Sequence, residues 1–277
     1  MDLYAAFQFS RNTAEVCPAA KLQIIDGTII DAMHRLGVII PSSNTTVEAE
    51  FTKALVDSDV TCHFARVPLR DVTLHDLECM VSELDGAAGL LRDASVDVVA
   101  FACTSGSLIK GRGYDANLAK RIRDAAGCHA LTTSGAVIDA LHALGAKKIC
   151  LATPYIDEVT DREVDFLEQN GFRVLKRVSL GLKENLKIGQ LTPTVAGALA
   201  ESAFSPDADA VFVSCTNFRT FEAITALEQK LCKPFISSNS ATLWASLRVF
   251  GSKCPVELGQ LLENRNISNA KAWCNLA

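Results

Sequence analysis

LGVIIPSSNTTVEAE, residues 36–50, decides the fold. Its first half is a short apolar run that ends at Pro41, and its second half carries threonines that can cap a helix beginning near Thr46. The stretch KICLATPYIDEVTDRE, residues 148–163, repeats this order of apolar run, proline and helix-like sequence. Because Pro41 and Pro154 lie 113 residues apart, the chain contains two related strand–loop–helix units.

A second pair of stretches has nearly the same spacing. DVVAFACTSGSL (97–108) parallels DAVFVSCTNFRT (209–220), and the two strand-end cysteines, Cys103 and Cys215, are 112 residues apart. Both pairs of stretches therefore indicate one duplication, and we expect two similar domains related by a pseudo-twofold axis.

Short apolar runs alternate with helical stretches along most of the chain. This pattern predicts an α/β fold with parallel sheets that helices cover on both faces. Ligands of such sheets bind at the carboxyl ends of the strands. We therefore expect the active site in the cleft between the two domains. The predicted strands include TCHFARV, DVVAFAC, KICLAT, RVLKRV, DAVFVSC and KPFIS.

The domain limits follow from the same pattern. Residues 1–33 have weak periodicity and are interpreted as an N-terminal extension. The first domain should comprise residues 34–128 plus 239–277, and the second residues 129–238. Within residues 239–277, where the chain returns to the first domain, the apolar stripe TLWASLRVF (242–250) predicts a packed helix.

Composition excludes several functional classes. The 277 residues include 27 basic and 32 acidic side chains in no long single-sign runs, which argues against a nucleic-acid partner. No apolar stretch approaches the roughly 20 residues of a membrane span. The N-terminus lacks the pattern of a secretory signal, so we expect a cytoplasmic protein with no membrane partner.

The cysteine and histidine spacing indicates no metal site. The chain has ten cysteines and five histidines, but no CxxC pair and no metal-ligand pattern, so reduced thiols and no metal are expected. Neither GxGxxG nor GxxxxGK[ST] is present. The sequence therefore predicts no cofactor.

Cys103 and Cys215 are the candidate catalytic residues. A lone cysteine that ends an apolar strand is more often a small core residue than a nucleophile, but a matched pair in a repeat favours function. Backbone N–H groups at such a turn favour thiolate and can bind a carboxylate. Neutral donors follow each cysteine: Thr104, Ser105, Thr216 and Asn217.

Four strings together resemble the maleate cis-trans isomerase family, within the superfamily that includes aspartate/glutamate racemases and arylmalonate decarboxylase. They are GVIIPSSNTTVEAE (37–50), ACTSGS (102–107), TPY (153–155) and SCTN (214–217). The SSNTT segment is what points to the isomerase branch.

The resemblance implies roles for five residues. Cys103 would be the nucleophile and Cys215 the partner acid/base, while Asn44, Tyr155 and Asn185 would hold the carboxylates of a small dicarboxylate. The implied reaction is cofactor-independent isomerisation of maleate, or a related cis-enedioate, by transient thiolate addition. From spacing alone, Asn44 has an equal claim to be a turn or helix-cap residue.

Other functions fit parts of the pattern. Two facing thiols also suit a racemase, a single proton-donating cysteine suits a decarboxylase, and a two-lobed architecture suits a non-catalytic dicarboxylate-binding protein. The sequence is compatible with a homo-oligomer but does not determine the oligomeric state.

Overall fold

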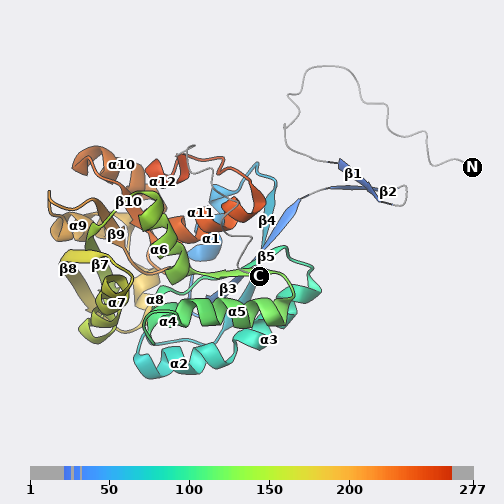
Figure 1. The fold of residues 1–277 in the computed structure, drawn as a ribbon, viewed down its shortest axis with the longest axis horizontal. Helices are drawn as coiled ribbons and strands as arrows, with labels where there is room; N and C mark the ends of the chain where they lie inside the picture. Colours follow the sequence, from blue (N-terminus) through green and yellow to red (C-terminus); the bar gives the residue numbers. More distant parts are fainter. Residues whose placement is uncertain (1–21, 26–27, 32, 264–277) are drawn as a thin grey trace, which may run out of the picture.

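The computed structural model describes residues 33–263 and, for their backbone only, residues 22–25 and 28–31. Residues 1–21 and 264–277, parts of the expected extension and of the expected first domain, lie outside the described residues. Within the segment interpreted as an extension, β1 (Leu22–Ile25) pairs antiparallel with β2 (Thr28–Asp31), apart from the main body (Figure 1). The weak periodicity of residues 1–33 gave no indication of this strand pair.

The first sheet is parallel and has the order β4-β3-β5-β6. Its strands are β3 (His34–Pro41), β4 (Val60–Val67), β5 (Val98–Phe101) and β6 (His129–Thr132). The helices of this half are α1 (Val47–Ala54), α2 (Leu74–Ser82), α3 (Leu84–Asp93), α4 (Thr104–Leu108), α5 (Tyr114–Ala126) and α6 (Thr133–Ala143).

The second sheet repeats this topology. Read in the matching direction its order is β8-β7-β9-β10, also parallel, so each strand occupies the position of its counterpart in the first sheet. The strands are β7 (Lys148–Tyr155), β8 (Arg173–Leu182), β9 (Ala210–Val213) and β10 (Phe235–Ser237). The helices are α7 (Asp157–Gln169), α8 (Asn185–Gly189), α9 (Pro193–Ala203), α10 (Phe221–Leu231), α11 (Ser238–Phe250) and α12 (Gly259–Glu263). The predicted duplicated α/β fold is confirmed.

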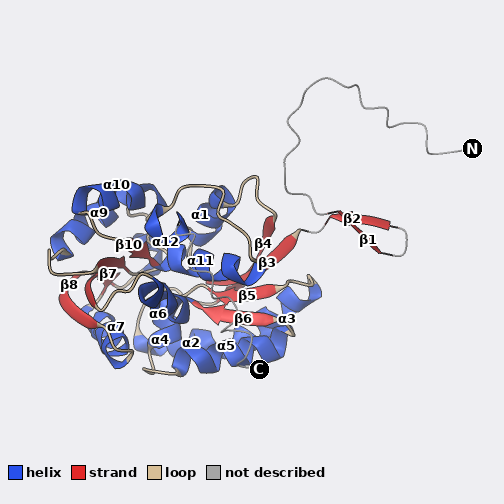
Figure 2. Ribbon diagram, turned by 45° about the horizontal axis from the view of Figure 1, so that its top comes forward, coloured by secondary structure: helices blue, strands red, loops and turns tan. Residues whose placement is uncertain are grey.

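The central strands of each sheet are buried on both faces, which explains why β3, β5, β7 and β9 read as nearly continuous apolar runs, whereas the edge strand β8 is half-exposed. In the first sheet Ile39 and Phe101 face the layer of α2, α3 and α5, whereas Val38 and Ile40 face α1 and α11. Figure 2 shows helices on both sides of the two sheets.

Helix α11 lies between the two halves. Its Leu243 and Leu247 pack with residues of the first sheet, and its Ala241 and Trp244 pack with residues of the second. The helix predicted from TLWASLRVF is thus buried along most of its length, although Val249 near its end is 45% exposed. Because α11 covers both sheets, it fixes their relative position.

The chain passes from the first sheet to the second slightly later in the sequence than expected. The expected domain boundary is residue 128, yet β6 pairs with β5 in the first sheet, with His129 opposite Val98. HALT (129–132) is too short and too mixed to stand out as a strand in the sequence. The division into two domains otherwise stays a prediction.

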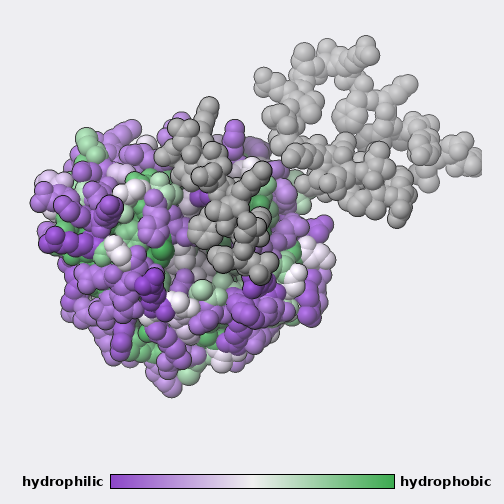
Figure 3. Space-filling view, viewed as in Figure 1, coloured by the Kyte–Doolittle hydropathy of each residue, from purple (hydrophilic) through white to green (hydrophobic). Residues whose placement is uncertain are grey.

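The outer surface is mostly polar. On the face in Figure 3, hydrophobic side chains form small, separate groups among hydrophilic ones. Among the described helices, none combines the length and the apolar character that crossing a bilayer requires.

Candidate active site

Cys103 and Cys215 lie two residues beyond the ends of the central strands β5 and β9, and each is only 4% exposed. Both cysteines contribute to the same buried core cluster, together with Tyr155 at the end of β7. Thr216 Oγ1, next to Cys215, donates to the carbonyl of Ala102, next to Cys103, at 3.0 Å, so the two cysteine loops lie side by side. The structure therefore brings the two cysteines of the repeat together.

Ser238 connects the two cysteine loops. Its Oγ accepts a hydrogen bond from Thr104 Oγ1 at 2.7 Å and another from the backbone N of Cys215 at 3.0 Å. Ser238 is the first residue of α11 and is fully buried. One hydroxyl thus holds the residue that follows Cys103 and the backbone of Cys215 in a fixed relation.

Asn44 stabilises the start of α1 and also contacts a cysteine loop. Its Oδ1 accepts from the backbone N of Thr46 and of Val47, at 2.9 and 3.0 Å, and so caps the start of α1. Its Nδ2 donates to Thr216 Oγ1 at 3.2 Å, and Thr216 Oγ1 donates in turn to the carbonyl of Ala102 at 3.0 Å. This chain of bonds links the first strand-end loop to both cysteine loops.

Asn185 and Asn217 join loops of the two halves. Asn185 Nδ2 donates to Ser43 Oγ at 2.8 Å, and Asn217 Nδ2 donates to the Asn185 carbonyl at 2.7 Å. Asn217 Oδ1 accepts from the backbone N of Thr45 at 2.8 Å. A Cβ on Gly189 would lie 2.9 Å from both polar side-chain atoms of Asn217, so glycine is needed there. Much of the donor capacity of these amides therefore holds the site together.

Tyr155 and Ser105 are the polar side chains beside the thiols. The Tyr155 hydroxyl lies beside the Cys215 sulfur, and burial raises the pKa of this phenol well above its usual value. Ser105 Oγ lies 3.9 Å from Cys103 Sγ. Both side chains are neutral donors.

Burial outweighs the hydrogen bonds that favour thiolate. It raises the pKa of Cys103 to about 11, against the lowering effect of the Gly106 N–H and Ser105. It raises the pKa of Cys215 to about 12, against Tyr155 and the Asn217 N–H. Burial thus opposes the thiolate at both cysteines, because desolvation of the charged form is a larger effect than the hydrogen bonds.

The two cysteines differ in backbone conformation despite their matched positions. Cys103 is extended, with φ −147°, and α4 follows it directly. Cys215 has φ +97°, and no helix begins after it until Phe221. A positive φ in a residue with a Cβ costs about 1–3 kcal/mol, and such strain is concentrated at functional sites. The two thiols of the repeat are therefore held by backbones of different conformation.

Sequence reasoning missed two side chains near the thiols. Ser238 lies in SSNS after the strand KPFIS, and the matching position after β6, in TTSG, also carries a hydroxyl, so the repeat contained a signal for it. Glu163 on α7 is 1% exposed, and burial raises its pKa to about 8. No local pattern distinguishes Glu163 from the other acidic residues of its helix.

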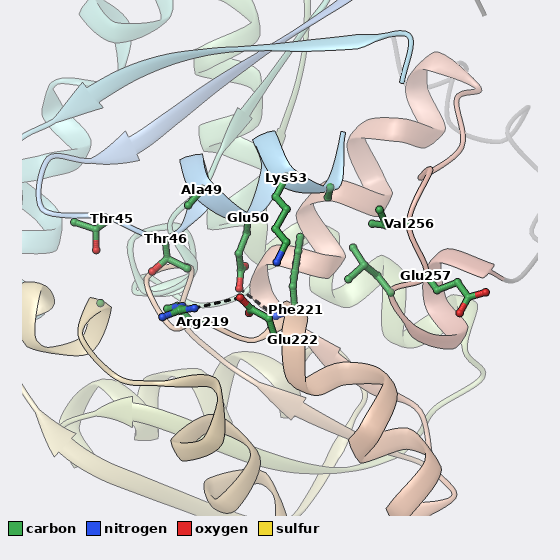
Figure 4. A pocket seen from close by; sticks show the side chains of 13 residues that line it. Thr45, Thr46, Ala49, Glu50, Lys53, Arg219, Phe221, Glu222, Val256 and Glu257 are labelled. Atoms are coloured by element: carbon green, nitrogen blue, oxygen red, sulfur yellow. Dashed lines mark hydrogen bonds and ion pairs between the residues drawn. The ribbon is translucent and has the colours of Figure 1, made fainter. Parts of the chain in front are cut away.

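A cavity of about 650 Å³ lies beside the first loop and does not include the cysteines. Figure 4 shows it between α1, the start of α10 and the loop around Val256, with Lys53 and Arg219 at its wall. Glu50 at this cavity accepts hydrogen bonds from the backbone N of Thr220 and of Phe221, at 2.7 and 3.1 Å, and thereby holds α10 against α1. The cavity adjoins Thr45 and Gly189, which contact Asn217 of the candidate site, but neither cysteine lines it.

Comparison with known proteins gives consistent matches over most of the chain. Residues 36–262 match the family described as arylmalonate decarboxylase (Amdase). A maleate isomerase of Geobacillus stearothermophilus is 31% identical over 245 residues, which is 83% of this chain and 98% of that protein. An arylmalonate decarboxylase of Bordetella bronchiseptica is 29% identical over 78% of this chain and 90% of its own length.

A solved structure supports the same relationship. The maleate isomerase Iso from Pseudomonas putida S16, as a Cys-to-Ala variant with maleate, superposes with a TM-score of 0.80 at 32% identity. The match covers 83% of this chain and 97% of that one.

Proposed function

Because the chain is an enzyme of the arylmalonate decarboxylase family, with maleate isomerases among its relatives, we propose that it isomerises maleate, or a related cis-enedioate, to the trans isomer without a cofactor. The observation that carries the proposal is the pair of buried thiols after β5 and β9, held in register by Ser238. Neutral donors surround them, as a reaction that moves charge onto a carboxylate requires.

Isomerisation needs a double bond that becomes single for the time of a rotation. In the proposed reaction, Cys103 Sγ forms a bond to one alkene carbon. The π electrons move onto the other alkene carbon and the carboxylate attached to it, which together form an enediolate. Rotation about the new single bond is followed by cleavage of the carbon–sulfur bond, which restores the alkene as the trans isomer. The thiolate that leaves is the thiolate that entered, so no electrons or atoms are gained or lost.

The neutral resting thiols place a condition on this reaction. With its pKa raised to about 11, Cys103 must lose its proton as the substrate binds or as the carbon–sulfur bond forms. The second thiol, Cys215, and the Tyr155 hydroxyl beside it are the candidate donors to the intermediate. Either group can protonate the intermediate or donate a hydrogen bond to it. Asn44 and Asn185 would orient the carboxylates with the amide hydrogens that the loop contacts leave over.

A decarboxylase is the second candidate, because one relative carries that name. A single cysteine that donates a proton to the carbanion suffices for decarboxylation. Two matched thiols favour isomerisation instead, since one can add to the alkene while the other assists the intermediate.

The test is proton NMR of maleate incubated with reduced protein and no additive, since maleate and fumarate give separate vinyl signals. We expect fumarate with the parent protein, none with Cys103→Ala, and parent rates with Cys150→Ala, which removes a buried cysteine of β7 away from the strand ends. Unchanged maleate with folded protein and free thiols, combined with turnover of an arylmalonate, would replace the proposal with decarboxylation.

A further inference from the structure

Glu163 is a buried carboxyl that the proposed reaction does not use. It lies on the inner face of α7, one turn after Thr160, whose Oγ1 is hydrogen-bonded to Thr153 Oγ1 of β7 at 2.7 Å. Its side chain is 1% exposed. Neither carboxyl oxygen has a hydrogen-bond partner among the described residues. Carboxyl groups buried in this way are unusual, because the ionised form loses its hydration without compensation.

The groups around Glu163 belong to the active site. The Ser214 hydroxyl is likewise buried and without a regular hydrogen bond, yet it lies close enough to lower the pKa of Glu163 in part. Ser214 immediately precedes Cys215. Helix α7 also packs against α4, the helix that follows Cys103 (Figures 1 and 2). Glu163 therefore lies behind both cysteine loops.

The titratable groups that face this region are Tyr155 from the end of β7, Cys215 from the end of β9 and, through them, Cys103 from the end of β5. Negative charge on Glu163 raises the pKa of both Tyr155 and Cys215. In a buried enclosure with a low effective dielectric, two nearby negative charges repel each other strongly. An ionised Glu163 and an anionic Cys215 therefore exclude each other.

We propose that Glu163 is a positioning residue that controls charge at the second cysteine: as a neutral acid it permits negative charge on Cys215, and as a carboxylate it opposes that charge. The proposal rests on the proposed function in one respect, since a dicarboxylate substrate adds further negative charge to the same enclosure. A neutral Glu163 then also favours substrate binding.

The test of charge control uses alkylation instead of turnover. Reduced protein is treated with iodoacetamide at pH 6 and at pH 9, and the modification of Cys215 is followed by peptide mass spectrometry for the parent and for Glu163→Gln. The glutamine is nearly isosteric and cannot ionise. With the pKa of Glu163 near 8, the two proteins carry the same charge at pH 6 and different charges at pH 9.

We expect the parent and Glu163→Gln to be modified at equal rates at pH 6. At pH 9 we expect modification of Cys215 to be about tenfold faster in Glu163→Gln, which corresponds to a Cys215 pKa that is lower by about one. Glu168→Gln changes an exposed glutamate of the same helix and should match the parent at both pH values. Modification of Cys150 measures general opening of the protein. A ratio of variant to parent that is the same at both pH values would overturn the proposal, whether that ratio is one or higher.

Turnover gives a second readout. If maleate is isomerised, the alkaline loss of kcat/KM should move to higher pH in Glu163→Gln, with neutral-pH activity retained. If maleate is not isomerised but the alkylation ratio depends on pH as stated, the proposed function fails and charge control by Glu163 stands.

Discussion

Thr104 donates its hydroxyl hydrogen to Ser238 Oγ across 2.7 Å, and these two residues lie 134 positions apart in the chain. The same oxygen receives the backbone N–H of Cys215. The relative position of the two thiols thus depends on a side chain that takes no part in the proposed chemistry.

Replacing Ser238 with alanine should separate these loops. The variant leaves the Thr104 hydroxyl and the Cys215 N–H buried without an acceptor, which costs about 1–3 kcal/mol of unfolding free energy for each such group. We expect a lower midpoint in urea unfolding and at least a tenfold loss of kcat. Ser246→Ala, which removes only a hydroxyl bonded to the Thr242 carbonyl within α11, should keep kcat.

Gly106 allows the close approach of α4 to the nucleophile. A Cβ there would lie 3.0 Å from Cys103 Sγ and 2.5 Å from Met80 Cε. The methionine end can move, but the thiol is confined, so Gly106→Ala should displace Cys103 and lower kcat by at least tenfold with a smaller effect on stability. Gly86→Ala on α3, where a Cβ meets nothing within 4 Å, is the matched control. Unchanged kcat in Gly106→Ala would show that the thiol position is not limiting.

Gly189 has a similar role at the junction of Asn185 and Asn217. A Cβ would lie 2.5 Å from Thr45 Oγ1 as well as against the Asn217 amide. We expect Gly189→Ala to lose about 1–3 kcal/mol of unfolding free energy through overpacking and to raise KM for maleate. Gly197→Ala in α9, where the new methyl would lie 3.9 Å from Leu227, should be neutral or stabilising by about 0.5–1 kcal/mol. Equal unfolding midpoints for the two variants would contradict the crowding at Gly189.

Glu163 should make the stability of the protein depend on pH. Burial raises the pKa of this carboxyl from 4.5 to about 8, so the folded state holds the proton more tightly than the unfolded state. Its contribution to stability is therefore greatest below pH 4.5, falls as the pH rises, and is lost above about pH 8.

Glu163→Gln removes this loss. Relative to the parent, the variant should gain about 2–4 kcal/mol in unfolding free energy between pH 5 and pH 9, measured by urea denaturation. Glu168→Gln should follow the parent at each pH. A constant difference between Glu163→Gln and the parent over this range would mean that the carboxyl is ionised in the folded state as it is in the unfolded state, and would contradict the raised pKa.

Much of the fold was predictable because its determinants are local and repeated. The apolar runs that end at Pro41, Cys103, Pro154 and Cys215 mark the four central strand ends, and the spacing of these residues predicted the duplication. The strand pair β1–β2 and the short strand β6 were missed, since four-residue strands without a strong pattern are set by their partners.

The candidate site was predictable only in part. Strand-end position indicated the cysteines and the polar residues that follow them. The link through Ser238 and the location of Glu163 depend on contacts between distant segments, and local sequence does not encode them. The net effect on the thiol pKa was not predictable for the same reason: the turns that supply N–H donors can be inferred from the sequence, but the burial that raises the pKa depends on the folded surroundings.

The position of α11 has a consequence for the order in which the protein is made. Both cysteines and all strands of the two sheets are synthesised before Ser238 and the helix that it begins. A nascent chain that has been translated only to β10 has both thiols but neither the hydroxyl that joins their loops nor the helix that packs on both sheets. The contacts that join the two cysteine loops can therefore form only after α11 has been synthesised.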